Sequence, residues 1–192
     1  MKINIGSGFK RYNGFLNIDD DPLVNPDYLL NIETDPLPFE DNSVDEIRAY
    51  HIMEHIGEGF IPFMKELYRV CKNNALLDII VPHHLHDSFW GDPTHRRPIT
   101  VNVMYHFSKK WCLQQQETWM SSTGMAGKYN IDFDVEHYEF VPDSFYNELI
   151  DSVHKKRNEG KLTHDENFMF ERLMREATNV MITTKIKMRA VK

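Results

Sequence analysis

The sequence predicts an α/β fold, a three-layer sandwich around a mostly parallel, seven-stranded sheet whose C-terminal strand is antiparallel. Strand-like runs alternate with short helical segments through the first half of the chain, which indicates parallel strands joined by right-handed crossovers. Residues 76–81 are almost continuously apolar, as expected of a strand covered on both faces. Residues 180–190 alternate between apolar and mostly basic side chains, and this period of two predicts a long final strand.

The first half of the chain supplies most of the predicted strands. Residues 2–5 and 15–18 form the first two, and so few residues separate Gly8 from Gly14 that a helix between them has at most two turns. Further along, the apolar patterns predict strands at 28–32, 45–50 and 76–81 and a helix at 61–71, with a turn at residues 73–74.

The second half is less regular. Residues 83–128 are rich in aromatic and histidine side chains and predict loops with one or two helices. Phe145, Leu149 and Val153 recur at a spacing of four, which predicts an amphipathic helix over residues 143–157.

A second helix is predicted to start at a capping box formed by Thr163 and Glu166. We therefore expect a single domain over residues 1–192, with a core at 1–110. Residues 143–178 are expected to form a helical insertion before the last strand, which covers the site or contacts a second copy in a homodimer.

Composition narrows the class of protein. The 192 residues suit one domain, and 27% charged with 41% hydrophobic residues is typical of a globular chain. The net charge of −7 disfavours a nucleic-acid partner. Cys71 and Cys112 lie far apart and are expected to be reduced thiols, and no apolar stretch is long enough for a bilayer. We expect a cytoplasmic protein with no membrane partner.

Residues Gly6, Ser7 and Gly8 follow the first strand directly, and Asp19 ends the second. Glycines after a strand let the backbone approach a ligand closely, and a carboxylate on the next strand can accept hydrogen bonds from a ribose diol. The pattern therefore predicts a cofactor that contains a nucleoside. NAD is disfavoured, because Arg11 stands where its fingerprint needs a third glycine and Asp19 comes too early.

Three alternatives concern metals. Residues 19–21 are three consecutive aspartates, which resemble a glycosyltransferase metal motif but follow too few strands. His51, Glu54 and His55 match the inverted zinc-protease motif H-x-x-E-H. Glycines and a proline at positions 57, 59 and 62 would interrupt the long helix that this chemistry needs, so packing histidines are favoured over zinc. No bound metal is expected.

A third polar group follows the apolar strand that ends at residue 81. It comprises His83, His84, His86, Asp87, Asp92 and His95. Because ligands bind beyond the carboxyl ends of parallel strands, this group is a candidate for acid–base chemistry or substrate contact, with a metal site as the alternative.

Taken in order, these segments resemble the class I S-adenosylmethionine-dependent methyltransferases over about the first 110 residues. Residues 3–8 look like the first motif of that family and residues 14–19 like its second. The matching segments further on are residues 37–47, 51–55 and 66–72. Residues 91–100, with the sequence GDPTHRRPIT, resemble a loop found in one subgroup of this family.

The resemblance implies a Rossmann-like fold that binds S-adenosylmethionine. Gly6, Ser7 and Gly8 would line its methionine and ribose, and Asp19 would hold the ribose hydroxyls. Asn31 stands where the family commonly has Asp, and Ile32 would contact adenine. Tyr50 and His51 would lie near the sulfonium. The family's third glycine is replaced by Lys10, which is a departure from the pattern.

The implied reaction is methyl transfer to an oxygen or nitrogen of a small-molecule or saccharide-like acceptor. Motifs for methylating exocyclic amines or C5 of DNA bases do not follow the fourth strand. His95 and Asp92 are the candidate catalytic residues, as the base that removes a proton from the acceptor, with His83 and His86 as second choices. A non-catalytic S-adenosylmethionine-binding regulatory module and a zinc hydrolase using residues 51–55 are the alternative functions.

Overall fold

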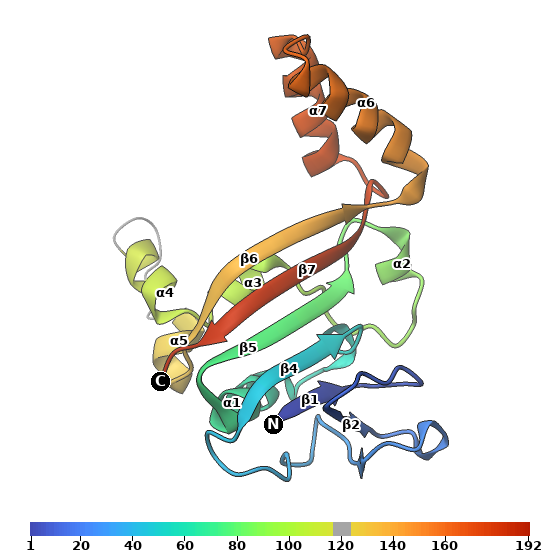
Figure 1. Ribbon diagram of the computed structural model, residues 1–192. Coiled ribbons are helices and arrows are strands. Elements are labelled where there is room, and N and C mark those ends of the chain that lie inside the picture. The colour runs from blue at the N-terminus through green and yellow to red at the C-terminus, as the bar shows by residue number, and fades with distance from the viewer. Residues whose placement is uncertain (117–123) are drawn as a thin grey trace.

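The computed structural model describes residues 1–116 and 124–192. Its centre is a seven-stranded sheet in the order β3-β2-β1-β4-β5-β7-β6 (Figure 1). Only β7 runs antiparallel to its neighbours, so the mostly parallel sheet with an antiparallel last strand is confirmed. The strands are β1 (Lys2–Ile5), β2 (Phe15–Asp19), β3 (Tyr28–Leu29), β4 (Val44–Tyr50), β5 (Cys71–Pro82), β6 (Phe133–Pro142) and β7 (Met181–Ala190).

The helices are mostly short. They are α1 (Phe60–Val70), α2 (Asp87–Trp90), α3 (Val101–Tyr105), α4 (Lys109–Gln116), α5 (Gly124–Tyr129), α6 (Asn147–Asn158) and α7 (His164–Glu176). Three 3₁₀ turns are η1 (Pro22–Val24), η2 (Met53–His55) and η3 (Ser144–Tyr146). The described part of residues 83–128 thus holds more helices than predicted, and residues 117–123 of that region lie outside the described residues.

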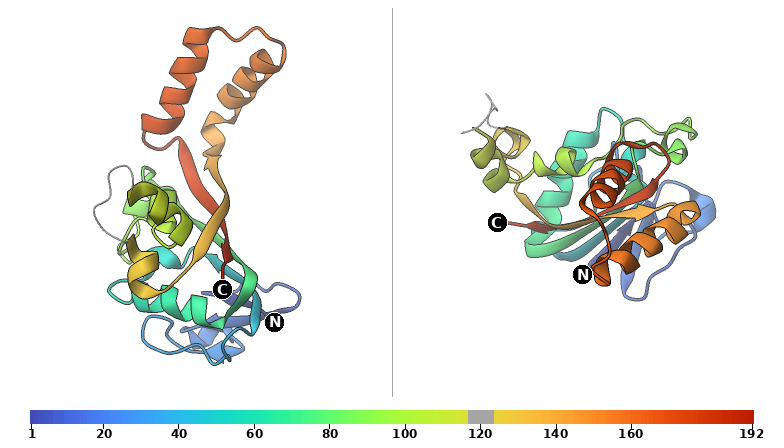
Figure 2. Two further views of the ribbon diagram at one scale, coloured as in Figure 1. Left: turned by 90° about the vertical axis from the view of Figure 1, so that its left-hand side faces the viewer. Right: turned by 90° about the horizontal axis from the view of Figure 1, so that it is seen from above.

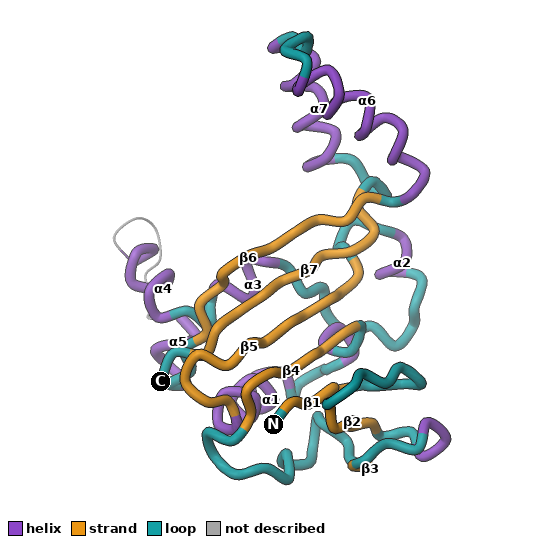
Figure 3. The backbone as a smooth tube through the Cα atoms, in the orientation of Figure 1, coloured by secondary structure: helices purple, strands orange, loops and turns teal. Residues whose placement is uncertain are grey.

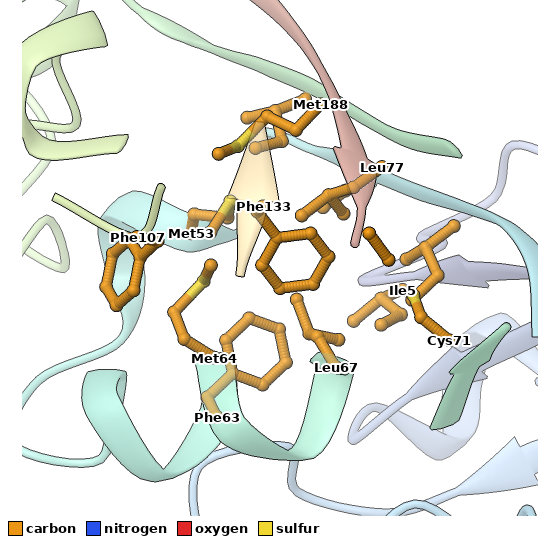
Figure 4. Close-up of a cluster of buried hydrophobic side chains, with 14 of the residues drawn as sticks. Ile5, Met53, Phe63, Met64, Leu67, Cys71, Leu77, Phe107, Phe133 and Met188 are labelled. Carbon is orange, nitrogen blue, oxygen red and sulfur yellow. The ribbon is translucent and has the colours of Figure 1, made fainter. Parts of the chain in front are cut away.

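One face of the sheet is apolar and packed. Ile47 and Ala49 of β4 and Leu77 and Ile79 of β5 are fully buried there, because strand side chains alternate between faces. The helix α1 covers this face, since Phe60, Phe63, Met64 and Leu67 recur at helical spacing. Figure 4 shows side chains from the sheet, α1 and the segment after α3 meeting in one core.

The opposite face is polar. Arg48 of β4 lies over the rings of Tyr12 and Phe15, with its guanidinium carbon 4.4 and 4.3 Å from their centroids. Beside it, the hydroxyl of Tyr50 donates a hydrogen bond of 2.6 Å to Asp78. None of the described helices packs across this face (Figure 2).

The described sandwich therefore has two principal layers where the sequence predicts three. The connections from β1 to β2 and from β3 to β4 contain no helix, and the one from β2 to β3 holds only η1. Figure 3 shows the first two connections as loops and η1 as a short helical segment. In this fold class such connections supply the covering helices, so their shortness leaves the polar face open.

The strands β5 and β6 differ clearly from the sequence-based expectation. No strand is predicted at β6, because Asp134, Glu136 and Glu139 interrupt its apolar pattern, yet it pairs with β7 along its length. The predicted turn at residues 73–74 lies inside β5, where Asn74 has φ +66° and the strand is irregular.

The helical insertion forms between β6 and β7. The helices α6 and α7 make a hairpin that projects away from the sheet (Figures 1 and 2). Thr163 and Glu166 form the predicted capping box at the start of α7. No helix in the described ranges is both long and apolar enough to cross a bilayer.

Candidate functional site

The loop after β1 adopts a conformation that requires glycine. Gly6 and Gly8 have φ of +61° and +50°, in the left-handed region. A Cβ added at Gly6 would lie 2.6 Å from the Cγ1 atom of Ile52, well inside van der Waals contact. Gly6 is therefore held between its own backbone conformation and the segment that follows β4.

Asp19 ties this loop to the end of β2. One carboxylate oxygen accepts a hydrogen bond of 2.8 Å from the backbone N–H of Gly8, and the other accepts one of 3.0 Å from Asp21. The N–H of Ser7 donates to the carbonyl of Ile18 at 3.2 Å. The structure thus brings four of the predicted residues together at the carboxyl ends of neighbouring parallel strands.

Asn31 and Ile32 lie beyond the end of β3, which stops at Leu29 and not at residue 32 as predicted. Asn31 is exposed, and its side-chain oxygen accepts a hydrogen bond of 2.9 Å from the N–H of Glu33. Ile32 is half-buried against the core. Both residues are therefore in a turn at the same edge of the sheet as the loop after β1.

Tyr50 is the last residue of β4, and His51 follows it. Burial and the neighbouring Asp78 raise the pKa of the Tyr50 hydroxyl, which stays a neutral donor. Its ring meets Tyr12 edge to face on the open face of the sheet. His51 has φ +55° and a half-exposed side chain. A residue other than glycine is strained in the left-handed region, so the backbone of His51 is strained at the end of β4.

The candidate catalytic residues lie against the turn η2. The loop that contains them folds back, and the N–H of Arg96 donates to the carbonyl of Glu54 at 2.8 Å. The Nε2 atom of His95 lies 4.0 Å from a carboxylate oxygen of Glu54 and 3.8 Å from one of Asp92. The His55 ring meets the His95 ring edge to face, with centroids 4.6 Å apart. We call Glu54, His55, Asp92 and His95 the Glu54 cluster.

Both ring orientations in the Glu54 cluster are set by hydrogen bonds at Nδ1. His95 Nδ1 lies 2.6 Å from the carbonyl oxygen of Phe89. His55 Nδ1 lies 2.9 Å from the hydroxyl of Thr94, which itself donates to Asp92 at 2.6 Å. The hydrogen bonds from Thr94 hold the pKa of Asp92 below its ordinary value.

Glu54 is the residue whose importance the sequence does not reveal. It is buried, with 1% of its side chain exposed, and neither carboxylate oxygen has a hydrogen-bond partner among the described residues. Its only signal was the H-x-x-E-H pattern. The motif lies on a three-residue 3₁₀ turn, so His51 and His55 are not one α-helical turn apart as that zinc chemistry needs.

His83 and His86 have other partners. The ring of His83 is buried, and its Nδ1 accepts a hydrogen bond of 3.3 Å from the N–H of Leu85. His86 Nε2 lies 3.3 Å from Asp143, at the base of the helical hairpin. His86 therefore links the loop after β5 to the hairpin, and His83 bonds within its own loop.

Replacing Gly6 with alanine tests the contact with Ile52. Because the new Cβ meets both positive φ and a clash, we expect unfolding free energy to fall by at least ~2 kcal/mol in chemical denaturation. Gly160→Ala is the matched control, since Gly160 has φ +66° and open space around its Cβ position. Equal losses in the two variants would show that Ile52 does not constrain the loop.

The buried His83 predicts a pH dependence of stability. Burial, with smaller contributions from His84 and His86, lowers the pKa of His83 from 6.5 to about 4. Between these values the unfolded chain binds more protons, so stability falls as pH drops from 6.5 towards 4. Urea denaturation at pH 7.0 and 5.5 measures the difference, and His83→Gln should reduce it. An unchanged difference in this variant contradicts the assignment.

Comparisons with known proteins show the fold. No family model matches the sequence, and no curated protein matches it. A SAM-dependent methyltransferase from Archaeoglobus fulgidus aligns with a TM-score of 0.61 at 14% identity, over 98% of this chain and 85% of that one.

Two further structures align over nearly the whole chain. Phosphoethanolamine N-methyltransferase 2 from Haemonchus contortus, in complex with S-adenosyl-L-methionine, has a TM-score of 0.54 at 14% identity, over 100% of this chain and 48% of that one. The [4+2]-cyclase SpnF has a TM-score of 0.54 at 14% identity, over 99% of this chain and 75% of that one. The chain therefore has the Rossmann-like fold of S-adenosylmethionine-dependent methyltransferase structures.

Proposed function

We propose that this protein is an S-adenosylmethionine-dependent methyltransferase. The observation that carries the proposal is the joining of the Gly6–Gly8 loop to Asp19 at the carboxyl ends of β1 and β2. Ligands of open α/β sheets bind outside these strand ends. A glycine loop for close approach and a carboxylate for a ribose diol together suit an adenosine-containing cofactor.

The remaining cofactor contacts come from the neighbouring strand ends. Asn31 and Ile32 lie in the turn after β3, on the side where adenine would extend from a ribose at Asp19. Tyr50 and His51, at the end of β4, are proposed to lie near the sulfonium. Each carboxylate oxygen of Asp19 retains a second lone pair for a ribose hydroxyl beyond its backbone bond.

The reaction is a displacement at the methyl carbon. A lone pair on an oxygen or nitrogen of the acceptor attacks this carbon as the bond to sulfur breaks, and the electron pair of that bond stays on sulfur. The thioether leaves as a neutral molecule and needs no acid, so positioning supplies most of the catalysis. Small-molecule or saccharide-like compounds are the proposed acceptors.

His95 is the proposed base for an acceptor that must lose a proton. Its Nδ1 is anchored on the carbonyl of Phe89, so Nε2 is the nitrogen that accepts. The carboxylate of Asp92, 3.8 Å away, stabilises the imidazolium that results. The base and the cofactor loop lie at the same edge of the sheet, since Gly6 contacts Ile52, which precedes η2.

Calorimetric titration with S-adenosylmethionine tests the cofactor. We expect one site per chain, and at least a tenfold loss of affinity in Asp19→Ala because the ribose hydroxyls lose their acceptor. Asp151→Ala, on α6, is the control for a lost acidic side chain elsewhere. The absence of binding to the unsubstituted chain would refute the proposal.

Transfer of a labelled methyl group to a panel of alcohols, amines and saccharides tests the reaction. With an accepted substrate, His95→Gln should lower turnover by ~10²-fold or more while cofactor binding persists, because the proton has no acceptor. Binding of the cofactor without transfer to any acceptor would favour the alternative, a regulatory module that binds S-adenosylmethionine.

A further inference from the structure

We propose that Glu54, His55 and His95 form a binding site for a divalent transition-metal cation, with Zn²⁺ as the first candidate. One ligand atom from each residue can be chosen so that all lie within 4.8 Å of one another, close enough to surround a single ion. This proposal does not depend on the methyltransferase proposal, because it rests on the Glu54 cluster alone.

The carboxylate of Glu54 needs a positive partner. Both of its oxygens are buried without hydrogen bonds to the described residues, and burial of an uncompensated carboxylate is strongly unfavourable. In the described chain, the basic side chains within 4.0 Å of a Glu54 oxygen are His51, whose Nδ1 lies at 3.6 Å, and His95, whose Nε2 lies at 4.0 Å. These separations exceed hydrogen-bond length but leave room for an ion between the side chains.

Hydrogen bonding also fixes the nitrogen that each ring offers. The carbonyl of Phe89 can only accept, so His95 donates from Nδ1. The Thr94 hydroxyl donates its single proton to Asp92, so the Nδ1 of His55 must donate to Thr94. In the neutral form of each ring, Nε2 is therefore left with a free lone pair for a metal.

These outer hydrogen bonds are of the kind that orient metal ligands. Histidine ligands usually donate their other ring N–H to a carbonyl or a carboxylate, which fixes the tautomer and the ring orientation. His95 does so directly, and His55 does so through Thr94 and Asp92. Asp92 is thus the outer partner of His55, and lies near His95 Nε2 as well.

The donor set indicates the class of metal. Two imidazole nitrogens with one carboxylate suit Zn²⁺ and neighbouring transition metals, and Mg²⁺ or Ca²⁺ would favour oxygen ligands. The arrangement differs from the zinc-protease motif, in which two motif histidines bind the metal and the glutamate is the base. Here Glu54 and His55 are ligands, and the third ligand comes from the loop after α2.

Occupancy of this site changes the role of His95. Its Nε2 lone pair cannot accept a proton while it binds a cation. Three protein ligands leave a position open on Zn²⁺, and an acceptor oxygen bound there would have a lower pKa. If both proposals hold, the cation would replace the histidine in promoting loss of the acceptor's proton in the metal-bound protein.

The test is titration of the full chain with ZnCl₂ after removal of metals with a chelator. Calorimetry should give one site, and substitution with Co²⁺ should give the visible absorption of a cation with nitrogen ligands. Glu54→Gln and His55→Ala should each weaken Zn²⁺ binding at least tenfold. His164→Ala, an exposed histidine on α7, is the matched control and should bind as the unsubstituted chain does.

Circular dichroism establishes that each variant is folded. If the buried Glu54→Gln substitution unfolds the protein, the half-exposed His55→Ala variant decides the question. No stoichiometric binding to the unsubstituted chain, or equal affinity in the cluster variants and His164→Ala, would overturn the metal site. Titration with S-adenosylmethionine is a separate measurement, so either proposal can fail alone.

Discussion

Side-chain alternation along β4, β5 and β7 places apolar residues on one face of the sheet and polar residues on the other. Ile47, Leu77 and Ile186 are fully buried on the first face. Burying such a side chain contributes about 1.5–3 kcal/mol, whereas exposed ion pairs contribute about 0–1 kcal/mol. The sheet is therefore held from one side, by α1 and the segments around α3. Pairs such as Arg189–Glu136 on the other face add little to its stability.

The packed side also positions the candidate site. Arg97 donates to the carbonyl of Ile56 at 3.2 Å, and its guanidinium lies over the ring of Phe60 in α1. A carboxylate oxygen of Glu33 accepts hydrogen bonds from the N–H groups of Gly57 and Gly59. The segment between β4 and α1 is thus hydrogen-bonded to the loop after β3, through Glu33, and to the loop after α2, through Arg97. This network places Glu54 beneath the loop that carries His95.

Sequence patterns predicted the features that depend mainly on neighbouring residues in the chain. The capping box at Thr163 and the alternating strand β7 follow patterns of residues close in sequence, and both form as expected. Gly6 and Gly8 have the positive φ that a glycine loop allows, although Asp19 and Ile52, from elsewhere in the chain, hold this loop in place. The edge strand β3 is shorter than predicted because the chain turns at Asn31, where the backbone hydrogen-bonds to Asp35. The strand β6 escaped prediction because its stability comes from pairing with β7, not from its own apolar pattern.

The Glu54 cluster shows where local patterns are insufficient. The sequence indicates His95 and Asp92 as part of the polar group that follows β5. It indicates Glu54 and His55 only as part of the H-x-x-E-H motif. Nothing in either stretch indicates that the two meet, because the contact depends on the fold of the loop after α2. Gly57 and Gly59 correctly indicated that no long helix contains the H-x-x-E-H motif. They did not exclude the short 3₁₀ turn η2 in the same motif.

The absence of a helix between β1 and β2 has an electrostatic consequence. A helix amino-terminus brings about half a unit of positive charge to a nucleotide site, and this connection brings none. Three acidic residues, Asp19, Asp20 and Asp21, lie at the end of β2 instead. Such a site attracts cations. If S-adenosylmethionine binds here as proposed, this negative charge favours the cationic cofactor over the neutral thioether that methyl transfer leaves.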